Sequence, residues 1–276
     1  MSSSSIKSLI KDLLPPIVLK SLKKSMTQSK CYNSYDEAMN DADGYENETL
    51  VRIIVAKGKR FAESIARTKE LDLMSLRSFV GLSSTLNGKK LTVIDFGGAA
   101  GTHFFIAKSI LSKDILIDWR IVETTAMVNE AKQQGLETAE LKFFDSIETA
   151  ASNVVIDLIF ASGSIQYTSN PYEFLKSLAS INAKNLMITR TPITDSPAVI
   201  IQRSSLGSNG VGDIPSELGV TDKVISYPAT MMDRDKVEDI LSSFGTTILK
   251  ISEEKGSYSS RVNSYDMWGY VVSKEI

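Results

Sequence analysis

The segment VIDFGGAAGTHFF, from Val93 to Phe105, joins an apolar run to several glycines and to the only histidine of the chain. Such a run is typical of a buried strand, and a glycine turn between a strand and a helix is typical of a nucleotide-like ligand site. A dinucleotide loop, G-x-G-x-x-G counted from Gly97, would need glycine where this chain has Ala99 and Thr102. A phosphate-binding P-loop is excluded, because no Gly-Lys-Ser or Gly-Lys-Thr follows.

The acidic residue before the glycines gives a different pattern, acidic-x-Gly-x-x-x-Gly, formed by Asp95, Gly97 and Gly101. This pattern resembles motif I of class I S-adenosylmethionine (SAM) methyltransferases. SAM has no phosphate, but its cationic sulfonium and its amino group favour a nearby carboxylate, and small residues let the backbone approach its methionine portion. The resemblance implies that SAM is the cofactor. The implied contacts in this loop are Asp95, Gly97, Gly98, Ala99 and Gly101.

Three later strand ends carry residues that the same resemblance implies for SAM. Glu123 ends IDWRIVE, where a carboxylate accepts hydrogen bonds from both ribose hydroxyls, and Thr124 follows it. Asp145 ends LKFFD, where the adenine amino group binds, and Ser162 is one of the small residues that end the next strand. The alternative for each acidic residue alone is a surface cap at a strand end.

A narrower resemblance is carried by VIDFGGAAGTHFF, ASGSIQYTSNPYEFLKSL, ITRTPI, Gln202 and SYPATMM. Together these look like a family of SAM methyltransferases from bacterial surface-polysaccharide gene clusters, over roughly Tyr35 to the C-terminus. Members often have glycine where this chain has Ala99 or Ala100. The resemblance implies an enzyme (EC 2.1.1.-) that methylates a hydroxyl or carboxylate of a saccharide, either a small molecule or a lipid-linked precursor, in cytoplasmic lipopolysaccharide or polysaccharide biosynthesis.

His103 and Arg190 are the candidates for catalysis, and no metal is expected. His103 follows the glycine loop and is a candidate general base; the alternative is that it only packs against the loop. Arg190 ends the expected strand NLMITRT, and its guanidinium suits a carboxylate or phosphate on a saccharide. The alternative for Arg190 is an ordinary salt bridge. One histidine and one cysteine cannot form a multi-His or Cys-rich metal site.

Candidate contacts to the acceptor follow the fourth and fifth expected strands and continue into a long polar segment. They are Gln166, Tyr167, Thr191, Gln202 and Tyr227. Gln166 and Tyr167 can bond sugar hydroxyls or cap the next helix. The polar segment, 192–232, is long enough to form a lid over the acceptor, and its Asp195 and Asp213 are alternative bases or solvated loop charges.

Alternating strand-like and helix-like segments position these residues. The expected strands are 91–96, 117–123, 141–147, 154–162, 185–191, 246–252 and 266–273, and the expected helices between them are 102–112, 124–135, 170–180 and 233–245. This order predicts an α/β fold with a mostly parallel, doubly wound sheet and an antiparallel C-terminal hairpin. Together with the resemblance, it implies the Rossmann-like class I methyltransferase fold with a seven-stranded sheet. A helical extension, 31–88, precedes the core, 89–276.

The first thirty residues differ from the rest in charge, +5 against −7. With apolar residues at helical spacing as well, we expect residues 1–30 to form a basic amphipathic arm, which either lies on an anionic membrane surface or packs on the domain. The chain has 31 basic and 33 acidic residues, so it has no excess of positive charge that would indicate nucleic-acid binding. No run is long enough to span a bilayer. We therefore expect a cytoplasmic protein, with or without peripheral contact at the inner membrane face, and either a monomer or a homo-oligomer.

Two other functions compete with the methyltransferase. The first is a non-catalytic SAM-binding partner in glycan assembly, which the intact Asp95, Gly97, Gly101 and Glu123 disfavour. The second is an NAD-dependent sugar dehydrogenase, which the failed dinucleotide spacing disfavours.

Overall fold

The computed structural model describes residues 30–43, 48–68, 70–71, 75–86, 88–260 and 263–274 of the 276-residue chain. The predicted basic arm, apart from Lys30, lies outside the described residues, so both interpretations of it remain predictions. Within the described part of the chain, no helix combines the length and the apolar character needed to cross a membrane.

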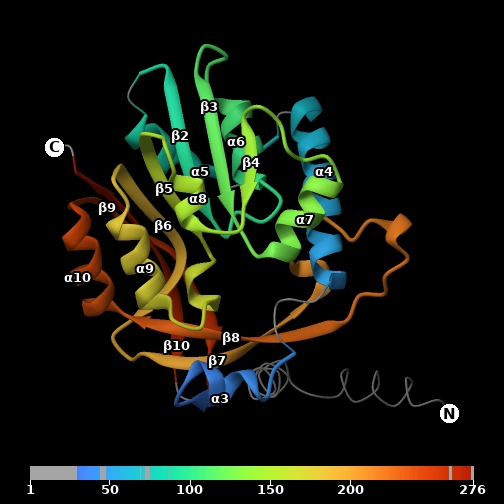
Figure 1. Cartoon of the computed structure of the whole chain (residues 1–276). Coiled ribbons are helices and arrows are strands. Elements are labelled where there is room, and N and C mark those ends of the chain that lie inside the picture. The colour runs from blue at the N-terminus through green and yellow to red at the C-terminus, as the bar shows by residue number, and fades with distance from the viewer. Residues whose placement is uncertain are drawn as a thin grey trace.

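A parallel sheet forms the centre of the molecule (Figure 1). Its strands are β2 (Lys90–Phe96), β3 (Leu116–Val122), β4 (Leu141–Phe144), β5 (Ile156–Ser162) and β6 (Ala183–Thr194), in the spatial order β4-β3-β2-β5-β6. The antiparallel strand β10 (Ser264–Ser273) pairs with β6, and β9 (Thr246–Ser259) pairs with β10. All seven predicted strands are present, and the predicted C-terminal hairpin is confirmed.

Helices cover both faces of this sheet (Figure 1). One face carries α4 (Glu48–Thr68), α5 (Ser75–Thr85), α6 (Thr102–Ile110) and α7 (Thr125–Gln133), and the other carries α8 (Ile147–Ala151), α9 (Pro171–Ser180) and α10 (Arg234–Phe244). Because both faces are covered, the central strand β2 is buried continuously from Leu91 to Asp95. The short helix α8 was not predicted from the sequence.

The predicted polar insertion, 192–232, contains two strands that the sequence analysis missed. They are β7 (Ala198–Ser205) and β8 (Val224–Asp233), an antiparallel pair that extends the sheet to ten strands, with β1 (Cys31–Tyr32) along the edge of β7. Ile200, Ala229 and Met231 of this pair pack against Tyr258 and Met267 of the C-terminal hairpin. Because a long polar segment separates these few apolar residues, the sequence of 192–232 resembles that of a loop. Figure 1 shows β7 and β8 running across beneath the carboxyl ends of the parallel strands.

Hydrogen bonds join the helical extension to this insertion. Lys57 of α4 is 1% exposed, and its Nζ donates to the carbonyl oxygens of Gly207 and Asn209, each at 2.7 Å. The short helix α3 (Tyr35–Met39) lies in the predicted helical extension, and Asp43, which follows it, accepts hydrogen bonds from the backbone and hydroxyl of Ser226. Extension and insertion therefore form one wall below the sheet, while the division of the chain at 30/31 and 88/89 remains a prediction.

Candidate functional site

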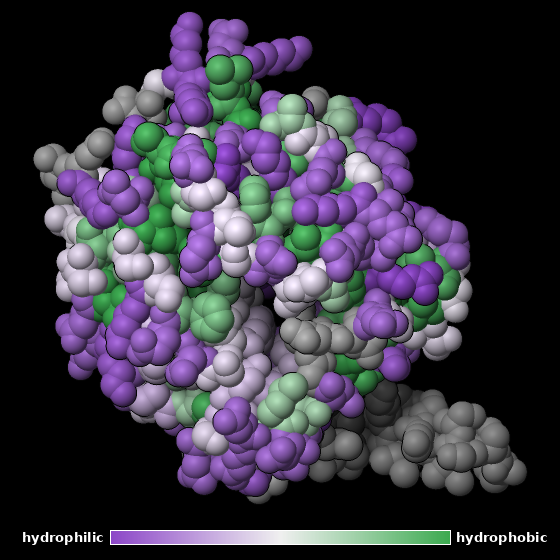
Figure 2. All heavy atoms as spheres, in the orientation of Figure 1, coloured by the Kyte–Doolittle hydropathy of each residue, from purple (hydrophilic) through white to green (hydrophobic). Residues whose placement is uncertain are grey.

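The carboxyl ends of β2, β3, β5 and β6 meet where the strand order reverses, with β3 on one side of β2 and β5 on the other. Ligands of open parallel sheets bind at this kind of switch point. Figure 2 shows the surface hollowed between the body of the sheet and the lower wall, and pale residues of intermediate hydropathy border the hollow. Several of the predicted site residues, among them Glu123 and Ser162, lie at or next to these strand ends.

The glycine loop after β2 is tightly packed. Gly97 has φ +68°, and a side chain there would begin 2.3 Å from Cβ of Ser164. A side chain at Gly98 would begin 2.5 Å from Oδ2 of Asp95. Both glycines are thus required by the loop's own packing, in addition to any ligand.

Asp95 lies beneath this loop with its side chain fully buried. Its Oδ2 accepts a 2.9 Å hydrogen bond from Nε1 of Trp119 and lies 3.9 Å from Nδ1 of His103, while its Oδ1 has no hydrogen-bond partner. Burial, assisted by the charge of Glu123, raises the pKa of Asp95 to about 7. The carboxyl group is therefore poised between its neutral and ionised forms, and a cation above the loop would favour ionisation.

Glu123 joins the end of β3 to the glycine loop. Its Oε1 accepts the backbone N–H of Ala99 and its Oε2 accepts the backbone N–H of Thr124, both at 3.0 Å. Thr124 also caps α7 by accepting the N–H of Met127. Burial raises the pKa of Glu123. Two backbone donors hold the carboxylate in a fixed orientation, and each oxygen keeps a second lone pair for a ligand hydroxyl.

The other two predicted cofactor residues are placed at strand ends. Asp145 is exposed directly after β4, and Ser162 is half-buried as the last residue of β5. Neither their contact with adenine nor their contact with the methionine portion is tested by the structure, so both roles remain predictions.

His103 is the second residue of α6, the helix after the loop, and stands edge-on to Phe160, with 4.8 Å between ring centroids. Its Nδ1 is buried without a hydrogen-bond partner. Burial, followed by the positive charge of Arg190, lowers the pKa of His103 to about 4. The imidazole is therefore neutral at physiological pH and can accept a proton, although its low pKa makes it a weak base.

Four of the predicted acceptor residues come together below the strand ends. The hydroxyl of Tyr167 donates to Oε1 of Gln202 at 2.8 Å, and its ring lies edge-on to Tyr227, with 5.2 Å between centroids. Gln166 precedes Tyr167 and is fully buried. Thr191 is different: it is 1% exposed, and its hydroxyl bonds back to the carbonyl of Thr189 in its own strand.

Sequence analysis missed three residues of this region. Tyr258 of β9 has its hydroxyl 2.6 Å from that of Tyr167 and 3.4 Å from Nε2 of Gln166. Glu253 of β9 and Arg77 of α5 form a buried ion pair, with 3.3 Å from Nε to Oε2. The strand that carries Tyr258 and Glu253 was predicted only as far as residue 252, and its polar sequence gave no periodic signal beyond that point.

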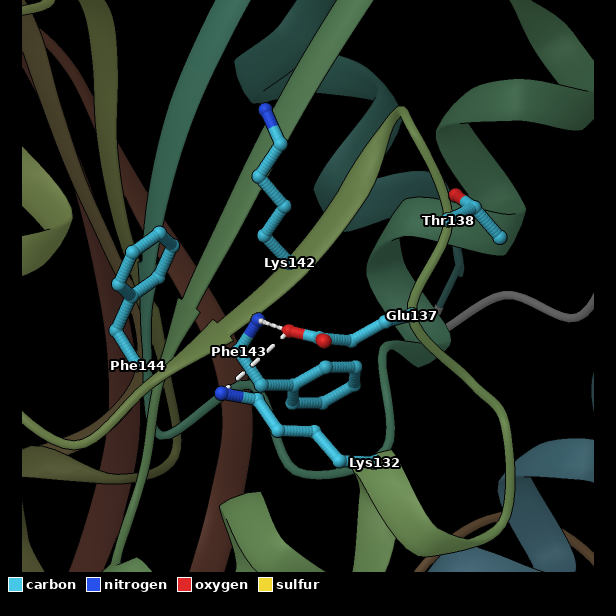
Figure 3. A pocket seen from close by; sticks show the side chains of 6 residues that line it. All are labelled: Lys132, Glu137, Thr138, Lys142, Phe143 and Phe144. Atoms are coloured by element: carbon cyan, nitrogen blue, oxygen red, sulfur yellow. Dashed lines mark hydrogen bonds and ion pairs between the residues drawn. The ribbon is translucent and has the colours of Figure 1, made fainter.

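Two surface hollows lie away from these residues. One, of about 380 Å³, flanks the edge strand β4 (Figure 3). There Glu137 accepts the backbone N–H of Phe143 at 3.0 Å and pairs with Lys132 at 3.7 Å, which covers the open edge of the sheet. The other hollow, of about 450 Å³, lies in the 206–223 loop beside Asp213, the alternative base. No residue predicted to bind the cofactor or the acceptor lines either hollow.

No protein-family model matches this chain, and no curated protein matches it. Solved structures do match. An S-adenosylmethionine-dependent methyltransferase from Clostridium acetobutylicum ATCC 824 is 12% identical, with a TM-score of 0.46 over 78% of this chain and 98% of that one. Magnesium protoporphyrin IX methyltransferase of Synechocystis PCC 6803, with bound S-adenosylhomocysteine (SAH), is 15% identical, with a TM-score of 0.40 over 82% and 100%. DesVI of Streptomyces venezuelae is 13% identical, with a TM-score of 0.41 over 71% and 89%.

The arrangement of the strands defines the fold independently of these matches. Five parallel strands lie in the order β4-β3-β2-β5-β6, followed by the antiparallel β10 and by β9 at the edge, and they confirm the predicted mostly parallel sheet with its antiparallel C-terminal hairpin. The protein therefore has a mixed α/β, Rossmann-like fold of the class I methyltransferase type.

Proposed function

We propose that the protein is a SAM-dependent methyltransferase. The observation that carries this proposal is the Glu123 carboxylate, which the N–H groups of Ala99 and Thr124 hold at the end of β3. Two vicinal ribose hydroxyls can donate to its two remaining lone pairs. A nucleotide phosphate would be repelled by this carboxylate and by Asp95, whereas a sulfonium cation is attracted.

SAM, when bound, supplies an electrophilic methyl group. The chain's own residues then have three tasks. Glu123 orients the cofactor, Asp95 stabilises positive charge above the glycine loop, and the acceptor residues hold a nucleophilic oxygen in line. If that oxygen belongs to a hydroxyl, His103 receives its proton; a carboxylate acceptor needs no base.

The acceptor we propose is a saccharide, free or lipid-linked, used in bacterial surface-glycan or lipopolysaccharide biosynthesis in the cytoplasm or at the inner face of the membrane. Support comes from the sequence resemblance and from the grouped side chains of Gln166, Tyr167, Gln202 and Tyr258, which offer hydrogen bonds without charge. Neutral donors and acceptors of this kind suit sugar hydroxyls.

Calorimetric titration with SAM, SAH and NAD tests the cofactor. We expect binding of SAM and SAH and none of NAD; the reverse order of affinity would favour the dehydrogenase. Conversion of SAM to SAH is then followed with a panel of sugars, uronic acids and sugar phosphates. SAM binding without turnover on any acceptor would favour the non-catalytic SAM-binding alternative.

The role of His103 is tested by His103→Ala. For a hydroxyl acceptor we expect turnover to fall by about 10²-fold or more, as for loss of a general base, while SAM affinity changes little. A rate equal to that of the unmodified protein would assign His103 to packing against Phe160.

A further inference from the structure

Arg190 lies at an irregularity in β6. The pairing between β6 and β10 shifts register between Trp268 and Tyr270, and Arg190 has φ +52°, which is unusual for a residue other than glycine. Bulges of this kind re-aim a side chain, and such backbone strain persists only where the surroundings hold it.

Two fully buried side chains hold the backbone of Arg190. Glu253 accepts its N–H through both carboxylate oxygens, at 3.0 and 3.2 Å, and Gln166 donates from Nε2 to its carbonyl oxygen at 3.2 Å. Glu253 also accepts hydrogen bonds from the Thr189 hydroxyl and pairs with Arg77. The hydrogen bonds of Glu253 and Gln166 therefore fix the backbone conformation of Arg190.

Arg77 and, after it, Arg190 lower the pKa of Glu254, but Glu254 pairs with Arg77 and not with Arg190. Across the described ranges of the chain, no carboxylate forms an ion pair with Arg190, and its Nε is buried without a hydrogen-bond acceptor. Oε1 of Gln166 is likewise buried without a partner. Buried polar groups normally have hydrogen-bond partners. A partly buried guanidinium held in place with an unpaired N–H is therefore expected where a ligand supplies the hydrogen-bond acceptor.

The guanidinium extends along the loop after β5, where its Nη1 lies 3.8 Å from the point at which a Gly163 side chain would begin. Its charge lowers the pKa of His103 on the cofactor side and opposes the rise in the pKa of Tyr258 on the acceptor side. Arg190 therefore lies between the two halves of the site, and Gln166 ties its backbone to the acceptor half.

We propose that Arg190 binds an anionic group of the acceptor, a carboxylate or a phosphate, so that the substrate class is an acidic saccharide. This inference rests on the proposed methyltransferase function. A guanidinium binds either anion through two parallel hydrogen bonds. The methionine carboxylate of SAM has the same chemistry, so the test must separate the two sources.

The Nε–H signal of Arg190 gives a direct reading by NMR, assigned by its loss in Arg190→Lys. The SAH-loaded protein is titrated with D-glucuronate, D-glucose 1-phosphate and the neutral methyl α-D-glucoside. We expect the two anions to move this signal saturably and to bind at least tenfold more tightly than the neutral sugar. Arg190→Gln should abolish that preference and leave the dissociation constant of SAH within twofold. Arg203→Gln, which removes an exposed arginine of β7, is the matched control and should change neither value.

Arg190→Asn serves as a second variant, because asparagine tolerates the left-handed backbone that position 190 requires. Absence of any anion-dependent shift with SAH bound overturns the inference. A tenfold or greater loss of SAH affinity in both Arg190→Gln and Arg190→Asn, with anion binding unchanged, assigns the guanidinium to the methyl donor and also overturns it. Failure of the unmodified protein to bind SAH instead rejects the proposed function, and the same titration without SAH still tests the anion site.

Discussion

The cofactor side and the acceptor side of the site are built in different ways. On the cofactor side, Asp95, Ala99 and Glu123 lie within 30 residues of one another, on or just after two adjacent strands, and backbone N–H groups fix the Glu123 carboxylate. On the acceptor side, Tyr167 contacts Gln202 and Tyr258, which are 35 and 91 residues away along the chain. The cofactor side is thus a local motif on parallel strands, whereas the acceptor side exists only after distant segments have packed.

This difference suggests how each side can be changed. Substitutions in the cofactor motif should act on SAM and leave the fold largely intact. Substitutions beneath the acceptor side should act on stability and on the acceptor together, because the same buried side chains support both. The following experiments test whether substitutions on the two sides differ in this way.

The largest effect is expected from Glu253→Ala. It would leave Arg77 without its buried partner and release the backbone N–H of Arg190, at a cost of about 3–5 kcal/mol in the free energy of unfolding. Urea denaturation measures the change. Glu254→Gln is the control, because Glu254 pairs with the same arginine but is 36% exposed, so its loss should cost less than about 1 kcal/mol. Equal losses would show that burial of Glu253 is unimportant.

Glu123→Ala should come next, with its main effect on the cofactor. Removal of the carboxylate takes away both proposed ribose acceptors. SAM affinity should therefore fall by at least roughly ten- to a hundredfold, which is the loss expected from a single hydrogen bond to a charged group, about 1.5–3 kcal/mol. Calorimetry gives the dissociation constant, with the exposed Glu148→Ala as control. An unchanged affinity would contradict the role of Glu123.

We expect Asp95 to have a smaller effect, which is a dependence of SAM affinity on pH. Since its pKa in the folded protein is about 7, above its usual value, the carboxyl group is mostly protonated at pH 6 and mostly ionised at pH 8. A bound cation favours the ionised form, so binding should release protons near pH 7 and SAM affinity should rise several-fold from pH 6 to 8. Asp95→Asn should remove this slope in parallel titrations; a slope that persists would place the titrating group elsewhere.

By the same linkage, Asp95 stabilises the fold less as pH rises. The folded state binds a proton that the unfolded state has already lost between pH 4 and 7, so the contribution of Asp95 to the free energy of unfolding falls across that range and is lost above about 7. The difference in stability between the unmodified protein and Asp95→Asn isolates this contribution from that of His103, whose lowered pKa acts with the opposite sign.

The smallest effect is expected from Tyr258→Phe. The change removes one hydroxyl from the Tyr167 pair, at a cost of about 1 kcal/mol, and should raise KM for the acceptor a few-fold without changing SAM affinity. Tyr265→Phe removes a hydroxyl in the same apolar cluster, one that bonds to Ser260 and not to Tyr167, and should leave KM unchanged. A matching rise of KM in both variants would indicate a general loss of packing.

Much of the core was predictable because the signals were local. Strand-like runs separated by helical segments gave the parallel sheet, and the helix expected over 170–180 forms as Pro171–Ser180, with proline at its first position. The placement of Glu123 beside the glycine loop also followed from the sequence, because parallel strands bring their carboxyl ends to one edge.

The lower wall could not be predicted in the same way. Because of Pro228 and the polar turn between β7 and β8, the sequence did not indicate that these segments form a strand pair. In the sequence, the buried Lys57 is indistinguishable from a solvated lysine of a helix. Their roles depend on partners about 30 to 150 residues away, and no local pattern encodes such partners.

The sequence by itself determined the fold class and the cofactor motif, because strand periodicity and the spacing of Asp95, Gly97, Gly101 and Glu123 act over short distances. Only the tertiary structure decided that His103 is neutral and that Glu253 and Gln166 clamp Arg190. The physical reason is burial: a pKa, an unpaired guanidinium or a strained backbone depends on what surrounds it, and those surroundings form only when the whole chain has folded.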